Sequence, residues 1–379
     1  GPKLQWRRGL GPRPDAAHLR LDPGPSGDGR TVAMSDRLLL ASQQPRQRGD
    51  RCMEYLQFLF VDFAGWPVWL WLSFVGVVLA LLIFDLGVLH RKEHEIGTAE
   101  ALLTSLLYIG IGVAFSGVVY LIYFNSAPVN GLDPQLAIAD DAERAWLAFE
   151  LYLTGFILEK TLALDNIFVI SLIFAYFAIP RLYQHRVLFW GIIGVIVLRA
   201  VMIGAGAVLV SQASWILYVF SIFLIWTGVM MLRKHEPTDI SKNPVLLFLR
   251  RRLRVSETLH GNKFFVRKPH PKTGRVVLWA TPLFLALIMV ELADVVFAID
   301  SVPAIFAITS DPFIVYTSNI FAILGLRALY FALAAMIHRF QYLKYALAAT
   351  LIFIGGKIFA GDFFPGGKVP AEWSLGVTA

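Results

Sequence analysis

The chain has 379 residues, of which 57% are apolar and only 16% are charged, and its net charge is +7. Soluble domains carry about 25% charged residues, so this composition argues against a water-soluble globule. It also excludes intrinsic disorder, because the chain holds 29 Phe and 10 Trp, and a disulfide scaffold, because Cys52 is its single cysteine.

The N-terminal segment differs from everything that follows it. Residues 1–52 contain ten Lys and Arg together with much Pro and Gly. We predict that this segment is a basic leader, either disordered or not native to the protein, and that residues 53–379 form a transmembrane domain.

Eight segments of this domain have the roughly 20 mostly apolar residues that cross a bilayer. A further apolar run begins at Trp373, so the alternatives are eight spans or eight spans and the start of a truncated ninth. The expected fold class is all-α, a polytopic membrane helix bundle. The predicted spans are 67–89, 100–124, 146–176, 187–210, 213–232, 277–308, 313–336 and 341–360.

Loop charge predicts the orientation of the bundle. The loop at 233–276 holds twelve Lys and Arg against three acids, which is typical of a cytoplasmic loop. The loop at 125–145 is acidic and is expected on the opposite side. Specific lipid or nucleic-acid binding is the alternative explanation of the basic loop. Orientation accounts for its charge without either, so we expect no nucleic-acid partner.

The spans contain an internal repeat. Three pairs of short segments match in the same order, three spans apart, so the repeat units are about 146–235 and 277–362. An odd offset reverses the direction of the chain, which predicts two inverted three-helix units with a site between them. Chance similarity of apolar spans is the alternative. The matching pairs are Leu162–Asn166 with Phe297–Ser301, Leu198–Ala200 with Leu326–Ala328, and Leu224–Gly228 with Leu351–Gly355.

Acidic residues lie inside two equivalent spans of this repeat. A charge at the bilayer centre costs about 3 kcal/mol or more, so such groups must meet each other, a cation or water. One explanation is structural pairing with Arg199 and Arg327, assisted by Lys160 and Lys357. The other is a shared cation site, with the two arginines as supporting counter-ions. The acids are Glu159, Asp165, Glu291, Asp294 and Asp300.

The ligand chemistry favours a hard divalent cation. Carboxylates and the Asn166 amide oxygen suit Mg²⁺, Ca²⁺ or Mn²⁺. Pro303 is expected to kink or unwind its helix around Asp300 and so free backbone carbonyls there. Asp85, near the end of the first span, is either an interfacial acid or an additional ligand. The histidines are expected in the leader, in turns and in loops, and we assign them no role.

Two of these segments carry a resemblance to a known family. The runs Glu159–Phe168 and Glu291–Pro303 resemble the two acidic signature segments of the TerC family, and the chain is most similar to its bacterial Alx branch. The resemblance covers about residues 53–379. It implies a multispanning protein of the bacterial inner membrane, related to LysE-type transporters, with links to manganese export and historically to tellurium resistance. The family pattern usually has a further C-terminal span, and residues 1–52 have no counterpart in it.

Three functions follow as alternatives. The first is a Mn²⁺ exporter with metal ligands Glu159, Asp165, Asn166, Glu291, Asp294 and Asp300, in which clustered carboxylates exchange protons for the ion. The second is a membrane-bound redox modulator, and the third is a scaffold that does not transport. We expect no enzymatic activity and no tightly bound cofactor; the bilayer and a divalent metal ion are the expected partners. Metal selectivity, direction of flux and oligomeric state stay open.

Overall fold

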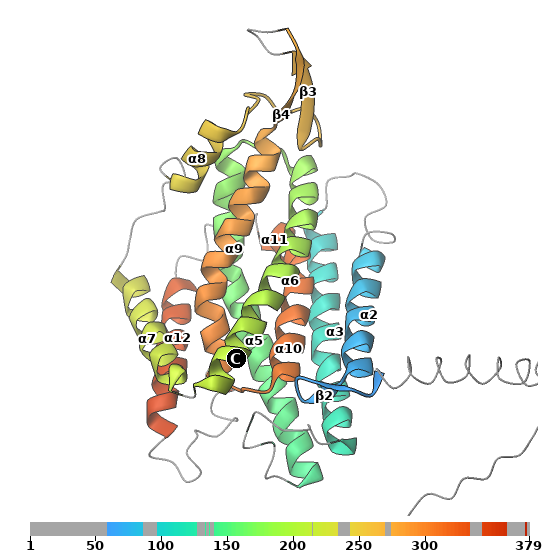
Figure 1. The fold of residues 1–379 in the computed structure, drawn as a ribbon, viewed down its shortest axis with the longest axis vertical. Helices are drawn as coiled ribbons and strands as arrows, with labels where there is room; N and C mark the ends of the chain where they lie inside the picture. Colours follow the sequence, from blue (N-terminus) through green and yellow to red (C-terminus); the bar gives the residue numbers. More distant parts are fainter. Residues whose placement is uncertain are drawn as a thin grey trace, which may run out of the picture. The chain divides into compact units, whose positions relative to one another are not determined.

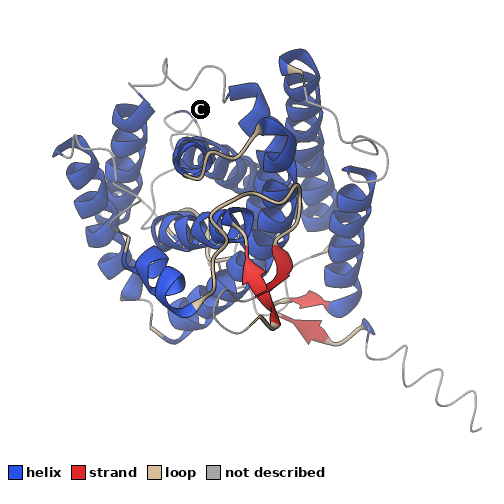
Figure 2. Ribbon diagram, turned by 90° about the horizontal axis from the view of Figure 1, so that it is seen from above, coloured by secondary structure: helices blue, strands red, loops and turns tan. Residues whose placement is uncertain are grey.

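A computed structural model describes residues 59–85, 97–126, 133, 136, 140–213, 215–233, 243–269, 274–333, 343–361 and 376. The predicted leader lies outside these residues. So does the run that begins at Trp373, apart from Gly376. The described part is mostly helical (Figures 1 and 2), with strands confined to short hairpins.

The helices coincide with the eight predicted apolar segments, with one more helix in the basic loop (Figure 1). Proline and capping residues set several of their starts. Asp140 caps α5, Asp311 caps α10, and Pro282 and Pro312 occupy first-turn positions where their missing N–H costs nothing. The helices are α2 Val68–Phe84, α3 Thr98–Asn125, α5 Asp141–Tyr176, α6 Arg181–Gln212, α7 Ile216–Arg233, α8 Pro244–Arg252, α9 Pro282–Phe306, α10 Pro312–Leu324, α11 Leu326–Leu333 and α12 Leu343–Gly361.

Length and hydropathy qualify some of these helices to cross a membrane. Among the described residues four helices qualify, α3, α6, α7 and α9, and the bent pair α10–α11 makes a fifth when counted as one span. This supports a multi-pass membrane protein, and the count of eight spans stays a prediction. Many of the apolar side chains on these helices point outward, such as Leu103 and Val201, which are 71% and 66% exposed. A bilayer is the solvent that such a surface requires.

Two short antiparallel hairpins depart from the all-α prediction. Strands β1 Asp62–Phe63 and β2 Trp66–Pro67 pair ahead of α2, and β3 Phe265–Pro269 pairs with β4 Val276–Ala280. The predicted span at 277–308 therefore starts too early. Val276–Ala280 is rich in β-branched and aromatic residues and pairs with β3, and α9 begins only at Pro282.

Helix α9 also corrects the expectation about Pro303. The helix continues without interruption from Pro282 to Phe306, so the backbone around Asp300 is not unwound. Proline removes the one hydrogen bond to the carbonyl four residues earlier, and only one helical turn follows it. That loss is small enough for the surrounding packing to hold the helix together.

The helix contacts follow a reciprocal pattern. Outside the predicted repeat units, α3 packs closely against α5 and also contacts α11. Among the helices of the predicted units, α5 packs against α10 as α6 packs against α9, and α5–α9 and α7–α12 are the other principal pairs. If α5 is exchanged with α9, α6 with α10–α11 and α7 with α12, the same set of helix pairs results. Such a pattern is what two related three-helix units would produce, while the repeat and its inversion stay predictions.

Candidate cation site

Arg199 lies at the centre of a buried polar cluster. It extends from α6 between α5, α9 and α10 and is 1% exposed. Its Nη1 donates to the Glu159 carboxylate, to Ser301 Oγ at 2.9 Å and to Asn319 Oδ1 at 3.3 Å. Its Nη2 reaches Asp294 Oδ1 at 3.5 Å, the limit of a hydrogen bond. One arginine thus neutralises acids from both predicted repeat units.

Asn319 completes this cluster. Its Oδ1 accepts from Arg199, while its Nδ2 donates to Glu159 Oε2 at 3.0 Å. Glu159 therefore has a partner on each of its oxygens. The buried Glu159 carboxylate and the Arg199 guanidinium form a structural ion pair, because removal of either charged group would leave the other buried and unpaired.

Asp165 and Asp300 lie elsewhere, on the wall of a cavity of about 150 Å³. Sequence analysis places them at equivalent positions of the two repeat units, and the fold brings them to the same cavity. Thr227 Oγ1 of α7 donates to Asp300 Oδ1 at 3.4 Å. We call this cavity the chamber. Its lining residues are Leu162, Asp165, Asn166, Arg199, Thr227, Met231, Phe297, Asp300, Ser301, Leu347 and Leu351.

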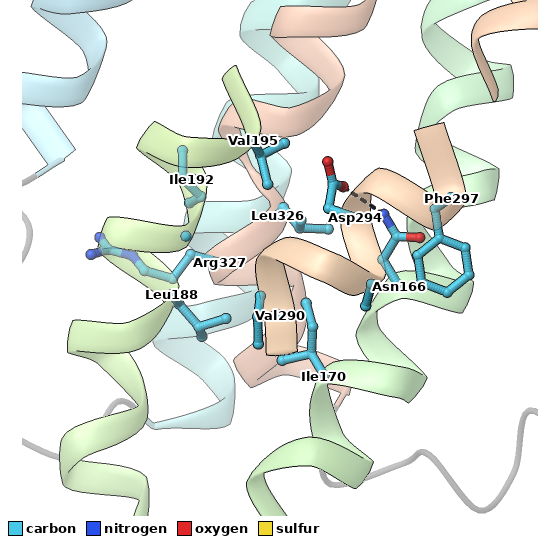
Figure 3. A pocket seen from close by; sticks show the side chains of 12 residues that line it. Asn166, Ile170, Leu188, Ile192, Val195, Val290, Asp294, Phe297, Leu326 and Arg327 are labelled. Atoms are coloured by element: carbon cyan, nitrogen blue, oxygen red, sulfur yellow. Dashed lines mark hydrogen bonds between the residues drawn. The ribbon is translucent and has the colours of Figure 1, made fainter. Parts of the chain in front are cut away.

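A second and much smaller cavity, of about 20 Å³, lies beside Asp294 and has mostly apolar walls. Asn166 Nδ2 donates to Asp294 Oδ1 at 3.4 Å, and Figure 3 shows the two side chains meeting next to the ring of Phe297. Asn166 Oδ1 and Asp294 Oδ2 are buried and have no hydrogen-bond partner among the described residues. We call this the inner cavity; its volume suits a single water-sized guest.

Glu291 lines neither cavity. Its carboxylate packs against α6, where a Cβ added to Gly194 would lie 2.1 Å from Glu291 Oε1. Its Oε2 is buried without a hydrogen-bond partner in the part of the chain that the structure describes. The absence of a side chain at Gly194 is what makes room for this acid.

Arg327 pairs differently from its repeat equivalent Arg199. Its Nη2 lies 2.6 Å from Asp85 Oδ2, and its Nη1 lies 3.2 Å from His185 Nε2. Asp85 is 8% exposed, so this acid is buried and paired with Arg327, and its depth at the membrane interface stays a prediction. The assumption that no histidine has a role overlooked His185, which lies on the first turns of α6 and contacts this ion pair.

The six ligands predicted from sequence do not form a single cluster. Among the described residues, no group of three or more His, Cys, Asp or Glu is arranged to hold a metal ion. The acids divide instead into an arginine-paired set, a chamber pair and Glu291. Asp165 and Asp300, which the sequence predicted as facing half-sites, line one cavity, and sequence reasoning missed Thr227, Asn319 and Met231. Asn319 carried a usable signal, since an amide within an apolar span is costly unless it has partners.

Comparison with known proteins adds an independent line of information. The model of the integral membrane protein TerC family matches residues 144–379. A protein of Rickettsia bellii described as an uncharacterized membrane protein is 47% identical over 309 residues, which are 81% of this chain and 92% of that protein. The Escherichia coli K12 protein named "Putative membrane-bound redox modulator Alx" is 45% identical over 319 residues, or 84% and 92% of the two chains.

The Photorhabdus laumondii protein of the same name is 44% identical over 321 residues, which are 84% of this chain and 93% of that protein. No solved structure matches the chain. The residues matched by the family model include nearly all of α5 and the whole of α9, the two acid-bearing helices.

Proposed function

Because the chain belongs to the TerC family of integral membrane proteins, we propose that it is a transporter that exports a divalent metal ion, Mn²⁺, across the bacterial inner membrane. The observation that carries this proposal is the chamber, where Asp165 and Asp300 face a common cavity from helices α5 and α9. Arg199 also lines the chamber, but its ion pairs are with Glu159 and Asp294, and neither chamber carboxylate has an ion-pair partner among the described residues. Two such carboxylates in a membrane domain call for a mobile cation.

The chamber offers ligands that suit a hard divalent ion. Two carboxylates, the Asn166 amide and the Thr227 and Ser301 hydroxyls supply oxygen donors, and water can complete the coordination. The cavity of about 150 Å³ leaves space for a partly hydrated ion. Met231 adds a thioether to the lining, a softer donor that favours a transition metal over Mg²⁺ or Ca²⁺.

Alternating access would follow from the two related helix units. Helices α5 and α9 each carry one chamber carboxylate, so a relative movement of the units would expose the pair to one side and then to the other. The same carboxylates can release protons when the ion binds and take them up when it leaves, which would couple export to a proton gradient. In this scheme residues 233–276 face the cytoplasm.

Reconstitution into proteoliposomes tests the proposal directly. Purified protein should carry Mn²⁺ down an imposed gradient, and Asp165→Asn and Asp300→Asn should each abolish that flux, because an amide cannot supply the negative charge that balances the ion. Asp62→Asn is the matched control, since this acid is exposed on β1 and lies in neither cavity. Its flux should equal that of the wild type.

Two outcomes would refute the assignment. Wild-type protein without flux of any of Mn²⁺, Mg²⁺ or Ca²⁺ would end the transporter proposal. Flux that survives both chamber substitutions would leave transport standing and remove the chamber as its site. In cells, the same variants should lose protection against excess manganese at unchanged protein levels.

The printed name of the Alx relatives supports one alternative, a redox function. An intrachain dithiol requires two cysteines, and Cys52 is the single one in this sequence. A redox function would therefore need another electron carrier. Electron transfer to or from the purified protein, unaffected by Asp165→Asn, would favour this alternative over transport.

A further inference from the structure

Phe297 lies between the two cavities of the membrane domain. Phe297 and Asn166 are lining residues of both the chamber and the inner cavity. In Figure 3 the phenyl ring of Phe297 stands next to the Asn166 amide, whose nitrogen donates to Asp294. The ring is therefore part of the wall that separates the chamber acids from Asp294.

Phe297 belongs to a regularly spaced row of residues on α9 that otherwise consists of carboxylates. Glu291, Asp294, Phe297 and Asp300 follow each other at intervals of three residues. Each interval rises by about 4.5 Å and turns the helix by about 300°, so the four side chains form a shallow spiral along it. Three of the four positions are carboxylates. Phe297 is the apolar member, and it stands where the two cavities are divided.

The inner cavity has the features of a vacant polar position. Asn166 and Asp294 are each 5% exposed, and each presents a buried oxygen with no hydrogen-bond partner among the described residues. A buried acceptor in this condition is costly, and a cation or a water would relieve the cost. Arg199 reaches Asp294 at only 3.5 Å, whereas its contact with Glu159 is much closer. Asp294 is thus the carboxylate that Arg199 can release most easily.

The opposite end of the inner cavity is bounded by Arg327. In Figure 3 the guanidinium of Arg327 extends away from Asp294, and its ion pair is with Asp85. The inner cavity is therefore bounded by a ring on one side and by a paired arginine on the other. A cation at Asp294 would be enclosed between them.

We propose that Phe297 is a gate in a cation path that joins two carboxylate positions, the chamber pair Asp165–Asp300 and an inner position at Asp294 and Asn166. A divalent cation that moves between them displaces the phenyl ring, and the ring keeps the two positions from being open to each other at the same time. This inference rests on the proposed function for the identity of the cation. The compartment boundary itself rests on the cavities.

Passive flux is the first test of the gate. In proteoliposomes with a Mn²⁺ gradient and no proton gradient, Phe297→Ala should raise the rate of equilibration severalfold, and Phe297→Leu should raise it less. Phe306→Ala is the matched control. It removes the same ring from the same helix in the apolar core, and Phe306 lines neither cavity. It should leave the rate at or below the wild-type value.

Thiol protection tests the boundary without reference to transport. In a Cys52→Ser background, Ala293→Cys places a thiol in the inner cavity and Met231→Cys places one in the chamber. Each protein is embedded in nanodiscs and exposed to Ag⁺, and the thiols that stay free are then counted by maleimide labelling after denaturation. The chamber thiol should be protected quickly and the inner thiol slowly. Adding Phe297→Ala should make the inner thiol react as quickly as the chamber thiol.

The outcomes separate this inference from the proposed function. Wild-type protein without metal flux, together with the expected thiol pattern, would keep the gate and reject the cation as cargo. Metal flux with equal Ag⁺ protection of both thiols in the presence of Phe297 would overturn the gate and leave the transporter in place. Phe297→Ala that changes neither flux nor protection would likewise overturn it.

Discussion

The Arg199 cluster and the chamber hold acids of the same two helices in opposite ways. Around Arg199, Glu159 has a partner on each oxygen and lines neither the chamber nor the inner cavity. At the chamber, Asp165 and Asp300 face open volume, and Thr227 donates the one hydrogen bond that the described residues supply to the pair. Glu159, which has a partner on both oxygens, is held as a structural acid, whereas in the proposed function the acids that face a cavity bind a mobile cation.

Removal of the central arginine should give the largest effect. Arg199→Met leaves Glu159 and Asp294 buried without their cation, and breaking a buried pair in this way costs about 3–5 kcal/mol. Thermal unfolding of the detergent-solubilised protein should show the loss, and adding Glu159→Gln should restore part of it. Arg251→Met on exposed α8 is the control. Equal stability of Arg199→Met and wild type would erase the distinction between the two regions.

Asp311 represents a third kind of acid, held by neutral donors at the start of α10. It accepts from the backbone N–H of Phe313 and Ile314. Burial raises the pKa of Asp311 to about 6, and nearby Asp133 adds to the rise. Because the folded state then binds the proton more tightly than the unfolded state, this carboxyl makes the protein less stable as pH rises from about 4 to about 6.

Asp311→Asn should remove that pH dependence, because an asparagine side chain does not titrate. It should keep the helix cap, because asparagine also caps helices. The difference in unfolding free energy between variant and wild type should grow across this pH range, to about 3 kcal/mol at most. Thermal unfolding of both proteins from pH 4 to pH 8 measures it. A constant difference over the whole range would show that Asp311 titrates like an exposed acid.

Glu291 tests whether an acid outside both regions is structural. Gly194→Ala places a Cβ where the Glu291 carboxylate lies, so the carboxylate must move. Because it ends a flexible side chain, the loss should lie at the low end of the about 1–3 kcal/mol that overpacking costs. Combining it with Glu291→Ala should recover stability, because the space is then free. Gly110→Ala has nothing within 4 Å of the added Cβ and is the matched helical control. Parallel losses in both glycine variants would contradict the predicted clash.

The chamber acids should give the smallest change in stability. Asp165→Asn and Asp300→Asn remove a charge that no arginine neutralises and keep the side-chain shape, so unfolding free energy should shift by less than about 1 kcal/mol. Transport should be lost nonetheless. Thermal unfolding measured on the same preparations as the flux assay checks both statements. A loss of stability as large as that of Arg199→Met would place these acids among the structural ones.

Much of this organisation is visible in the sequence. Each predicted apolar segment coincides with a helix among the described residues, because hydropathy is a local property of the chain. The count of eight spans and the repeat stay predictions. The strand Val276–Ala280 escaped this reasoning because a short apolar run reads equally well as a helix or as a strand. The unbroken course of α9 through Pro303 escaped it because neighbouring helices compensate a single lost hydrogen bond.

The division of the acids is a property of the folded chain. The residue types and their depth in the spans predicted Asp165 and Asp300 as equivalent positions and Arg199 as a counter-ion, since a charge in the bilayer must be compensated wherever it lies. The structure pairs Arg199 with Glu159. Which acid receives the arginine, which faces the chamber and which fits against Gly194 depends on distances between side chains that are far apart in sequence. Only the packing of α5, α6 and α9 decides those distances.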